Sequence, residues 1–219
     1  LVVPGSGTNG YDDLQSAINA AGDGDVIILN KGIYPRGGFY IVDKVIMITS
    51  TNPDDPNVVA QTVIDCEGYL QGGVYWGTGG SGGFFFGSRS GSSVVNGLTI
   101  KDARGTYDGN YLMEYYIEEN FYYYSYYGNG GGAIYCSSKT SPTIANCVIT
   151  GAYLHGGTPD DPDDDIEAGL NGVRGSDGGS AFGGGIYVGA RSTPTIVNCA
   201  IRNCSVVGGN GANGATGGA

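Results

Sequence analysis

The chain has 219 residues, a length that suits one domain or a short repeat array. It contains 43 glycines and only 14% charged residues, so long helices, which favour residues such as Glu and Lys, are not expected. The net charge of -11 opposes binding to nucleic acid or to an anionic membrane surface, so partners should be neutral, cationic or bridged by a metal. No run of about 18 apolar residues occurs, and no segment is predicted to span a membrane.

One helix is predicted near the N-terminus, over residues 9–22. Leu14, Ala17, Ile18 and Ala21 follow the helical spacing i, i+3, i+4 and i+7. The apolar face is narrow and short, so the helix should not be stable alone. We expect it to cover the open end of the sheet that follows it.

Short β-rich runs follow from residue 25 onward, separated by clusters of Gly, Asn, Asp and Pro, and they predict strands of three to eight residues. No helical pattern separates them, which disfavours folds with helical crossovers. The predicted strands are 26–29, 45–48, 62–64, 84–86, 94–100, 133–136, 143–150, 185–188 and 195–202.

A repeated unit organises these strands. Residues 131–136 and 142–149 return at a constant offset of 52 as residues 184–188 and 194–201. Both copies hold Gly-x-Ile-Tyr, starting at Gly132 and Gly184, and Pro-Thr-Ile-x-Asn-Cys. A fainter third copy lies 49 residues upstream of the first, over residues 83–86 and 95–100. Repeats of this kind stack, because each unit buries its apolar face only against a neighbour.

These units resemble the repeats of a right-handed parallel β-helix of the pectate-lyase-like superfamily. They look like the repeat regions of large secreted or surface-anchored bacterial β-helix proteins, including the polymorphic outer-membrane type. Residues 14–66 resemble the capped first coil of that superfamily. The resemblance implies an all-β solenoid with an N-terminal capping helix and a surface location. The Phe-x-x-Asn motifs of the polymorphic type are absent here, so its autotransport is not carried over.

The predicted organisation is a single β-helix domain over residues 1–219. A cap covers 1–25, coils cover 26–205, and a Gly-rich tail without a capping sequence covers 206–219. Three unlike insertions interrupt the coils at the same point of each repeat and should stack along one side of the solenoid. They are residues 67–82, 104–130 and 153–183.

The second insertion holds a tyrosine cluster. Tyrosine offers a large contact area and a polar tip, which suits a protein interface or stacking on sugar rings. The alternative is packing of the insertion on its own coil and neighbours. The cluster comprises Tyr107, Tyr111, Tyr115, Tyr116, Tyr122, Tyr123, Tyr124, Tyr126 and Tyr127.

The third insertion holds an acidic run whose oxygens suit a hard cation such as calcium. The spacing lacks the register of a calcium loop, and an acidic run broken by proline is usually only solvated. Calcium is the one metal predicted here, and no other cofactor is expected. The candidate ligands are Asp160, Asp161, Asp163, Asp164, Asp165 and Glu167.

No catalytic residue is predicted. Acid-base chemistry on a sugar needs two carboxyls that converge, whereas Asp65, Glu67 and Asp102 sit at strand ends without a repeated partner. Lys101 and Arg202 read as isolated charges. His155, the single histidine, reads as an exposed loop residue.

Two further rows of side chains are predicted from the repeat. Cys147 and Cys199 should superpose as stacked core thiols, while disulfides between Cys199 and Cys204, or between Cys66 and Cys136, remain alternatives. On the opposite face, an outward ladder of aromatic rings is predicted from Phe86, Tyr135 and Tyr187.

The functional prediction is a non-catalytic structural protein of the extracellular space or cell surface. It self-assembles or adheres through its Tyr-rich and acidic insertions, and its partners are further copies, in an oligomer or filament, or a polysaccharide. The alternative is a polysaccharide lyase or hydrolase, or a carbohydrate-binding β-helix. The chain begins at Leu1 without a signal peptide, as a mature or trimmed product does.

Overall fold

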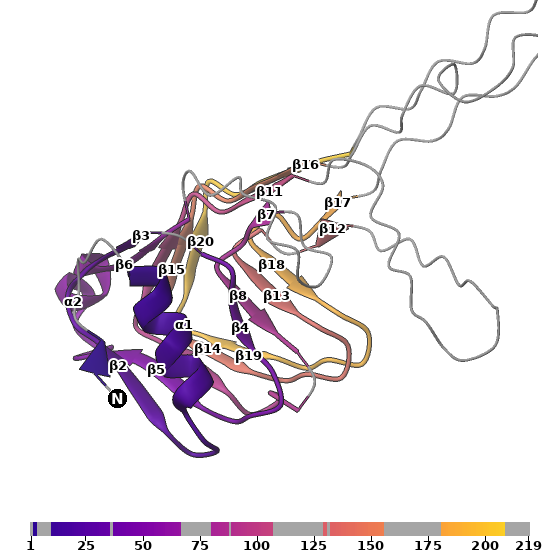
Figure 1. Ribbon diagram of the computed structural model, residues 1–219. Helices are drawn as coiled ribbons and strands as arrows, with labels where there is room; N and C mark the ends of the chain where they lie inside the picture. Colours follow the sequence, from indigo (N-terminus) through magenta and orange to yellow (C-terminus); the bar gives the residue numbers. More distant parts are fainter. Residues whose placement is uncertain are drawn as a thin grey trace, which may run out of the picture.

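The structure is a computed structural model that describes residues 2–3, 10–35, 37–66, 80–87, 89–106, 129–130, 132–155 and 181–208. These residues form stacked, almost entirely parallel β-sheets with two short helices, α1 (Gly10–Ala20) and α2 (Pro56–Gln61) (Figure 1). The predicted all-β class with parallel strands is confirmed. Within the described residues, no helix has the length and apolar character needed to cross a membrane.

Three large sheets make up the body. Sheet A runs in spatial order through β1 (Val2–Val3), β2 (Val26–Leu29), β5 (Met47–Ser50), β9 (Val94–Asn96), β14 (Thr143–Ala145) and β19 (Thr195–Val197). Sheet B runs through β3 (Gly32–Pro35), β6 (Thr62–Asp65), β10 (Thr99–Lys101), β15 (Val148–Thr150) and β20 (Ala200–Arg202). Sheet C runs through β4 (Phe39–Ile41), β8 (Phe84–Phe86), β13 (Ile134–Cys136) and β18 (Ile186–Val188).

Two smaller sheets flank the predicted insertions. Sheet D contains β7 (Gly80–Ser81), β11 (Arg104–Thr106), β16 (Tyr153–His155) and β21 (Ser205–Val207). A separate pair joins β12 (Asn129–Gly130) to β17 (Ala181–Phe182). The ends of the second and third insertions therefore lie side by side, at residues 104–106 and 153–155 on entry and at 129–130 and 181–182 on exit. The residues between those ends lie outside the described residues.

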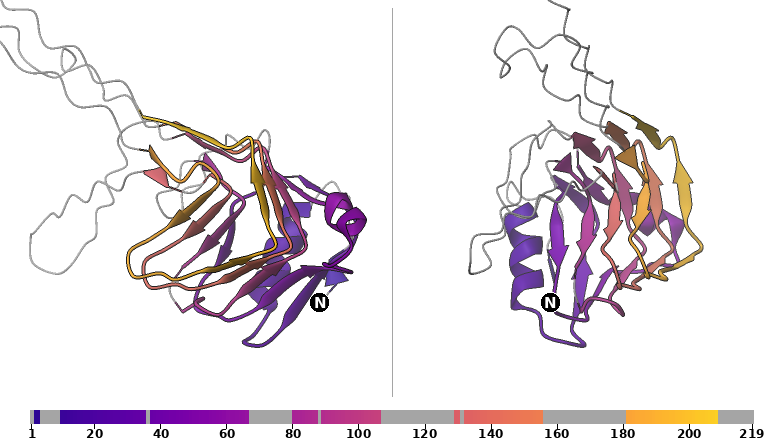
Figure 2. Two further views of the ribbon diagram at one scale, coloured as in Figure 1. Left: turned by 180° about the vertical axis from the view of Figure 1, so that it is seen from behind. Right: turned by 90° about the vertical axis from the view of Figure 1, so that its right-hand side faces the viewer.

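The chain visits sheets A, B and C in that order on each pass. We call these passes coils 1 to 5, covering residues 26–41, 47–86, 94–136, 143–188 and 195–207, the last ending after sheets A, B and D. Each coil pairs in parallel with the next, and among the described strands only β7 and β11 pair antiparallel. Figure 2 shows the coils stacked from the indigo N-terminal end, where α1 lies, to the yellow coil 5.

The register confirms the repeat and corrects one part of it. Ile144 pairs with Ile196 at the predicted offset of 52, and Val95 pairs with Ile144 at the predicted offset of 49. In sheet C the upstream offset is instead 50, because Phe85 pairs with Tyr135. The turn over residues 87–93 is one residue longer than the turn over 137–142, and it absorbs the difference.

The core is built from rows of like residues, one from each coil. In sheet B the inward row is Tyr34, Ile64, Ile100 and Ile149, all with 0% exposure. Side chains alternate along a strand and strands pair in register, so each inward residue packs on the inward residue of the next coil, and from Ile64 onward this is isoleucine on isoleucine. Burying each such side chain contributes about 1.5 to 3 kcal/mol of stability.

Both helices are held by identifiable contacts. Leu14 and Ile18 of α1 are buried in the same core, and the Lys44 ammonium donates to the carbonyls of Ile18, Asn19 and Ala21 at 2.7, 3.1 and 3.0 Å, where a cation satisfies the last carbonyls of a helix. α2 was not predicted. Its signal was Asp55, which caps it by accepting from the Asn57 N–H at 2.9 Å, followed by proline at the first helical position.

The asparagine of the repeated unit turns the chain from sheet A to sheet B. Asn146 and Asn198 adopt φ of 52° and 51°, a left-handed conformation that asparagine tolerates, and Gly97 occupies the same corner in coil 3 with φ of 69°. The amides stack: Asn198 donates to Asn146 Oδ1 at 2.6 Å, and Asn146 donates to Asn96 Oδ1 at 2.9 Å. The motif is therefore scaffold, as its geometry alone explains it.

Candidate functional site

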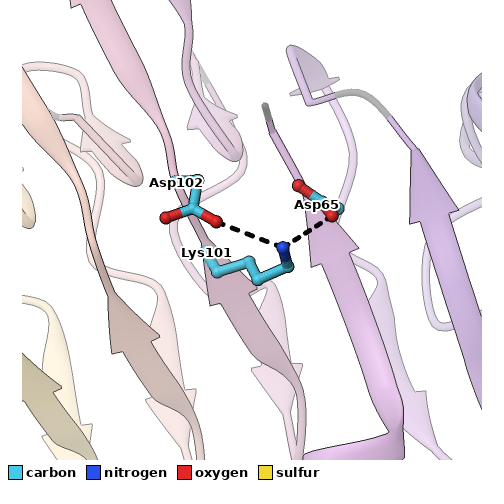
Figure 3. Close-up of polar contacts among 3 residues, drawn as sticks. All are labelled: Asp65, Lys101 and Asp102. Carbon is cyan, nitrogen blue, oxygen red and sulfur yellow. Dashed lines mark hydrogen bonds and ion pairs between the residues drawn. The ribbon is translucent and has the colours of Figure 1, made fainter. Parts of the chain in front are cut away.

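The clearest cluster of opposite charges lies on the outer face of sheet B. Lys101 of β10 reaches across to the preceding coil, where its Nζ lies 2.7 Å from Asp65 Oδ2, and it lies 3.1 Å from Asp102 Oδ2 on the following residue (Figure 3). The prediction that Lys101 is isolated is wrong, whereas the two aspartates were predicted only to lack a repeated partner. Lys101 and Asp65 occupy paired positions of adjacent strands, so the fold brings them together from 36 residues apart.

The cluster is suited to tying coils together rather than to acid-base catalysis. One ammonium donates to both carboxylates, so the cluster offers no separate proton donor and acceptor that converge on a substrate. The pKa of Lys101 is raised above its usual value by its hydrogen bond to Asp65, against a smaller opposing effect of burial, with further support from Asp102. The pairing therefore stabilises the charged form of Lys101 and, with it, the contact between coils 2 and 3.

We predict that Lys101→Met destabilises the fold by about 1 kcal/mol near neutral pH, since the variant loses a partly exposed ion pair and leaves two carboxylates without their cation. The pKa of Lys101 is higher in the folded state than in the unfolded chain. The stabilisation by the ion pair is therefore fully present below about pH 10.4, the pKa of lysine in the unfolded chain, and is lost as the pH rises through the pKa of Lys101 in the folded state. Urea unfolding at neutral and alkaline pH measures this.

Arg202→Met is the matched control, because Arg202 lies in the same outward row two strands further along. It forms no ion pair within the described residues. If K101M left the free energy of unfolding unchanged at neutral pH, or lowered it only as much as R202M does, a stabilising role for the cluster would be contradicted.

An outward aromatic ladder is present, with one member changed. Ring centroids are 5.8 Å apart for Tyr40 and Phe85, 5.2 Å for Phe85 and Tyr135, and 4.8 Å for Tyr135 and Tyr187. The predicted member Phe86 is instead fully buried, with 0% exposure. The prediction placed it one residue out of register, and the longer turn over 87–93 is the reason.

The end of coil 5 is the largest departure from an ordinary buried core. Its inward positions are Ile196, Ile201 and Val206, which are 44%, 48% and 45% exposed. Their partners one coil earlier, Ile144, Ile149 and Leu154, are 0%, 0% and 2% exposed. The same inward face is thus buried in coil 4 and uncovered in coil 5.

The backbone at this end is open as well. The three strands of coil 5, β19, β20 and β21, are each the last strand of their sheet, so half of their N–H and C=O groups point away from coil 4 and meet no described strand. An apolar face rimmed by free strand edges is a surface on which another chain can dock.

Comparisons with protein-family models, with curated proteins and with solved structures find no match for this chain. The site is therefore assigned from its own geometry.

Two thiols lie at the same open end. All five cysteines are free. Cys147 donates a hydrogen bond to the stacked Cys199, which lowers the pKa of Cys199 and, together with burial, raises the pKa of Cys147. Cys199 and Cys204 are partly exposed, whereas the other three are buried. The predicted stacked thiols are present, and neither alternative disulfide is formed.

Most of the remaining predicted site residues lie outside the described residues. The nine tyrosines Tyr107, Tyr111, Tyr115, Tyr116, Tyr122, Tyr123, Tyr124, Tyr126 and Tyr127 lie outside the described residues, as do Glu67 and the acidic residues Asp160, Asp161, Asp163, Asp164, Asp165 and Glu167. The backbone of His155 ends β16, in register with Thr106 and Val207. In the described part of the chain, no group of three or more His, Cys, Asp or Glu residues is arranged to hold a metal.

Proposed function

We propose that this protein is a non-catalytic structural component whose chains associate through the uncovered end of coil 5. The finer architecture belongs to the same proposal: a right-handed parallel β-helix of the pectate-lyase-like kind, capped by α1 and located outside the cell or on its surface. The exposure of Ile196, Ile201 and Val206, in positions that are buried in coil 4, is the observation that carries it.

Physical chemistry favours covering this end. An inward row of branched apolar side chains costs about 25 cal/mol for each Å² left in water, and open strand edges add unpaired backbone groups. A second chain that lays its own strands on β19, β20 and β21 removes both costs. The insertions, with their tyrosines and carboxylates, are proposed as further contacts around this one, and calcium binding by the acidic run stays a prediction.

The alternative reading, a polysaccharide lyase, hydrolase or carbohydrate-binding protein, has no described observation in its favour. The two carboxylates that the fold does bring together share one lysine. A subunit contact is therefore the function that the described geometry supports best.

The native thiols report directly on whether the end is covered. In dilute protein, iodoacetamide should modify Cys199 and Cys204, because both are partly exposed and a lowered pKa supplies the reactive thiolate of Cys199. At high protein concentration, association should slow both reactions by about tenfold or more, as measured by peptide mass spectrometry.

Cys66, Cys136 and Cys147 are buried and serve as internal controls. They should remain unmodified under both conditions unless the protein unfolds. Equal reaction rates of Cys199 and Cys204 across the concentration range would show that no chain covers this end.

A further inference from the structure

A second surface of the protein carries acidic side chains toward one end of the stack of coils and basic side chains toward the other. The turns that lead from sheet C into sheet A cover residues 42–46, 87–93, 137–142 and 189–194, and residues 21–25 lead from α1 into the same sheet. We call these five segments the C/A edge. In Figure 1 they form one side of the stack, from the indigo end to the yellow end.

Hydrogen bonds between neighbouring segments define this edge. Gly24 donates to the Val45 carbonyl at 2.8 Å, and the Ser93 hydroxyl donates to the Lys44 carbonyl at 3.2 Å. Thr143, the first residue of β14 directly after the fourth segment, donates its backbone N–H to the Ser93 carbonyl at 2.9 Å, and Lys139 donates its backbone N–H to the Ala190 carbonyl at 3.0 Å. The five segments therefore follow one another along the stack, and neighbours are spaced by the strand separation of about 4.8 Å.

The first two segments of the C/A edge are acidic and the last three are basic. The acidic block is Asp23, Asp25 and Asp43, and the basic block is Arg89, Lys139 and Arg191. All six side chains are exposed. Lys44 also lies here, but its ammonium is engaged with the carbonyls at the end of α1.

The basic block is a regular row. Each member is the third residue of its turn, with φ of 58°, 63° and 60° for Arg89, Lys139 and Arg191. Like charges one strand apart repel each other even in water. None of the three forms an ion pair within the described residues, so this repulsion is not relieved there.

We propose that two copies pair side by side and antiparallel along the C/A edge, so that the acidic block of each lies against the basic block of the other. One two-fold axis generates both contacts, as in other isologous dimers. A simple polyanion laid along the edge would match the basic block but meet the acidic block and a net charge of -11. A second copy sets the two acidic segments of each chain against the segments of Lys139 and Arg191 of the other, and only Arg89, in the middle segment, faces its own counterpart across the axis.

The C/A contact and the contact at the end of coil 5 are held by different forces. It spans five segments, about 19 Å, and its attraction is ionic and exposed, so it should be weak and should disappear at high salt. The end contact is apolar and should persist at high salt. The two proposals can therefore fail separately.

The test uses full-length protein that carries Ile196→Glu, which removes the end contact. Sedimentation velocity should show a weak dimer at about 50 mM salt, with the dissociation constant rising by about tenfold or more at about 500 mM. A parent protein that is monomeric at low salt would overturn the proposal.

Charge reversal then identifies the surface. Reversing the basic block with Arg89→Glu, Lys139→Glu and Arg191→Glu leaves an all-acidic edge, which should not dimerise. Asp43→Lys with Asp23→Asn and Asp25→Asn leaves a basic edge, which should not dimerise either; asparagine keeps an oxygen for the bonds that Asp23 and Asp25 accept from the N–H groups of Val45 and Gly22.

Mixing the two reversed variants is the decisive arm. An acidic edge and a basic edge should form a one-to-one heterodimer, measured by native mass spectrometry with the variants distinguished by mass. Unchanged dimerisation of either variant alone, or a mixture that stays monomeric although both variants keep the parent circular dichroism spectrum, would overturn the proposal. If the Glu variant does not fold, the Gln variant at the same three positions should fold and lose the dimer.

Discussion

Phe86→Ala is expected to cost about 3 to 5 kcal/mol of folding stability, which is the usual loss for removing a buried aromatic side chain. Phe86 has 0% exposure and lies between Ile41 and Cys136, its register partners, which are also fully buried. Deleting the ring leaves a cavity that the stacked coils cannot close without breaking strand pairing. Chemical denaturation monitored by circular dichroism measures the loss.

Phe85→Ala is the matched control, one residue away and on the other face. Phe85 lies on the outer face, with ring centroids 5.8 Å from Tyr40 and 5.2 Å from Tyr135, so its removal should cost about 1 to 3 kcal/mol, the size of two aromatic pairs. If Phe85→Ala proved the more harmful of the two, the register would be the one predicted from sequence, and the structure would be wrong at this strand.

The repeat was predictable because like residues of successive coils occupy like environments. Ile144 with Ile196 and Ile149 with Ile201 keep the same spacing in sequence and in space. The alternation of inward and outward residues needs no information beyond the pattern. The fold class therefore follows from the repeated residues.

Which side chains of β8 point inward was not predictable from the repeat pattern. Phe84, Phe85 and Phe86 are identical residues, so no alternation of polar and apolar side chains marks which of them point inward. The deciding feature is the one-residue difference in length between the turns over 87–93 and 137–142. A change of one residue in pairing moves every side chain of a strand to the other face.

The ion-pair cluster was missed for a different reason. Asp65 pairs with Lys101 at an offset of 36, which neither repeat offset covers, since coil 2 differs from the later coils in length and content. For the end of coil 5, the sequence predicted only that residues 206–219 carry no capping sequence, and residues 209–219 lie outside the described residues. The exposure of three inward apolar side chains there, each nearly half exposed, required the structure.

Ile196→Glu is expected to abolish association through the end of coil 5. A carboxylate at this inward position would be buried without a partner by any chain that covers the end, and such burial costs several kcal/mol. An effect of this size lowers an association constant by about a hundredfold or more. Sedimentation velocity over a range of protein concentrations measures it.

Val197→Glu is the matched control, because it introduces the same charge in the same strand. Val197 is 50% exposed and points outward, since its partner Ala145 lies on the outer side of sheet A next to buried Ile144. This variant should associate like the wild type. Circular dichroism of both variants shows whether coil 5 remains folded.

Sedimentation velocity of the wild-type protein at high salt isolates the apolar end contact, because the ionic C/A contact is screened under these conditions. We expect association that strengthens with protein concentration, is retained by Val197→Glu and is lost in Ile196→Glu. A wild-type chain that sediments as a single monomeric species at every concentration would contradict the claim that the uncovered end of coil 5 joins one copy to another.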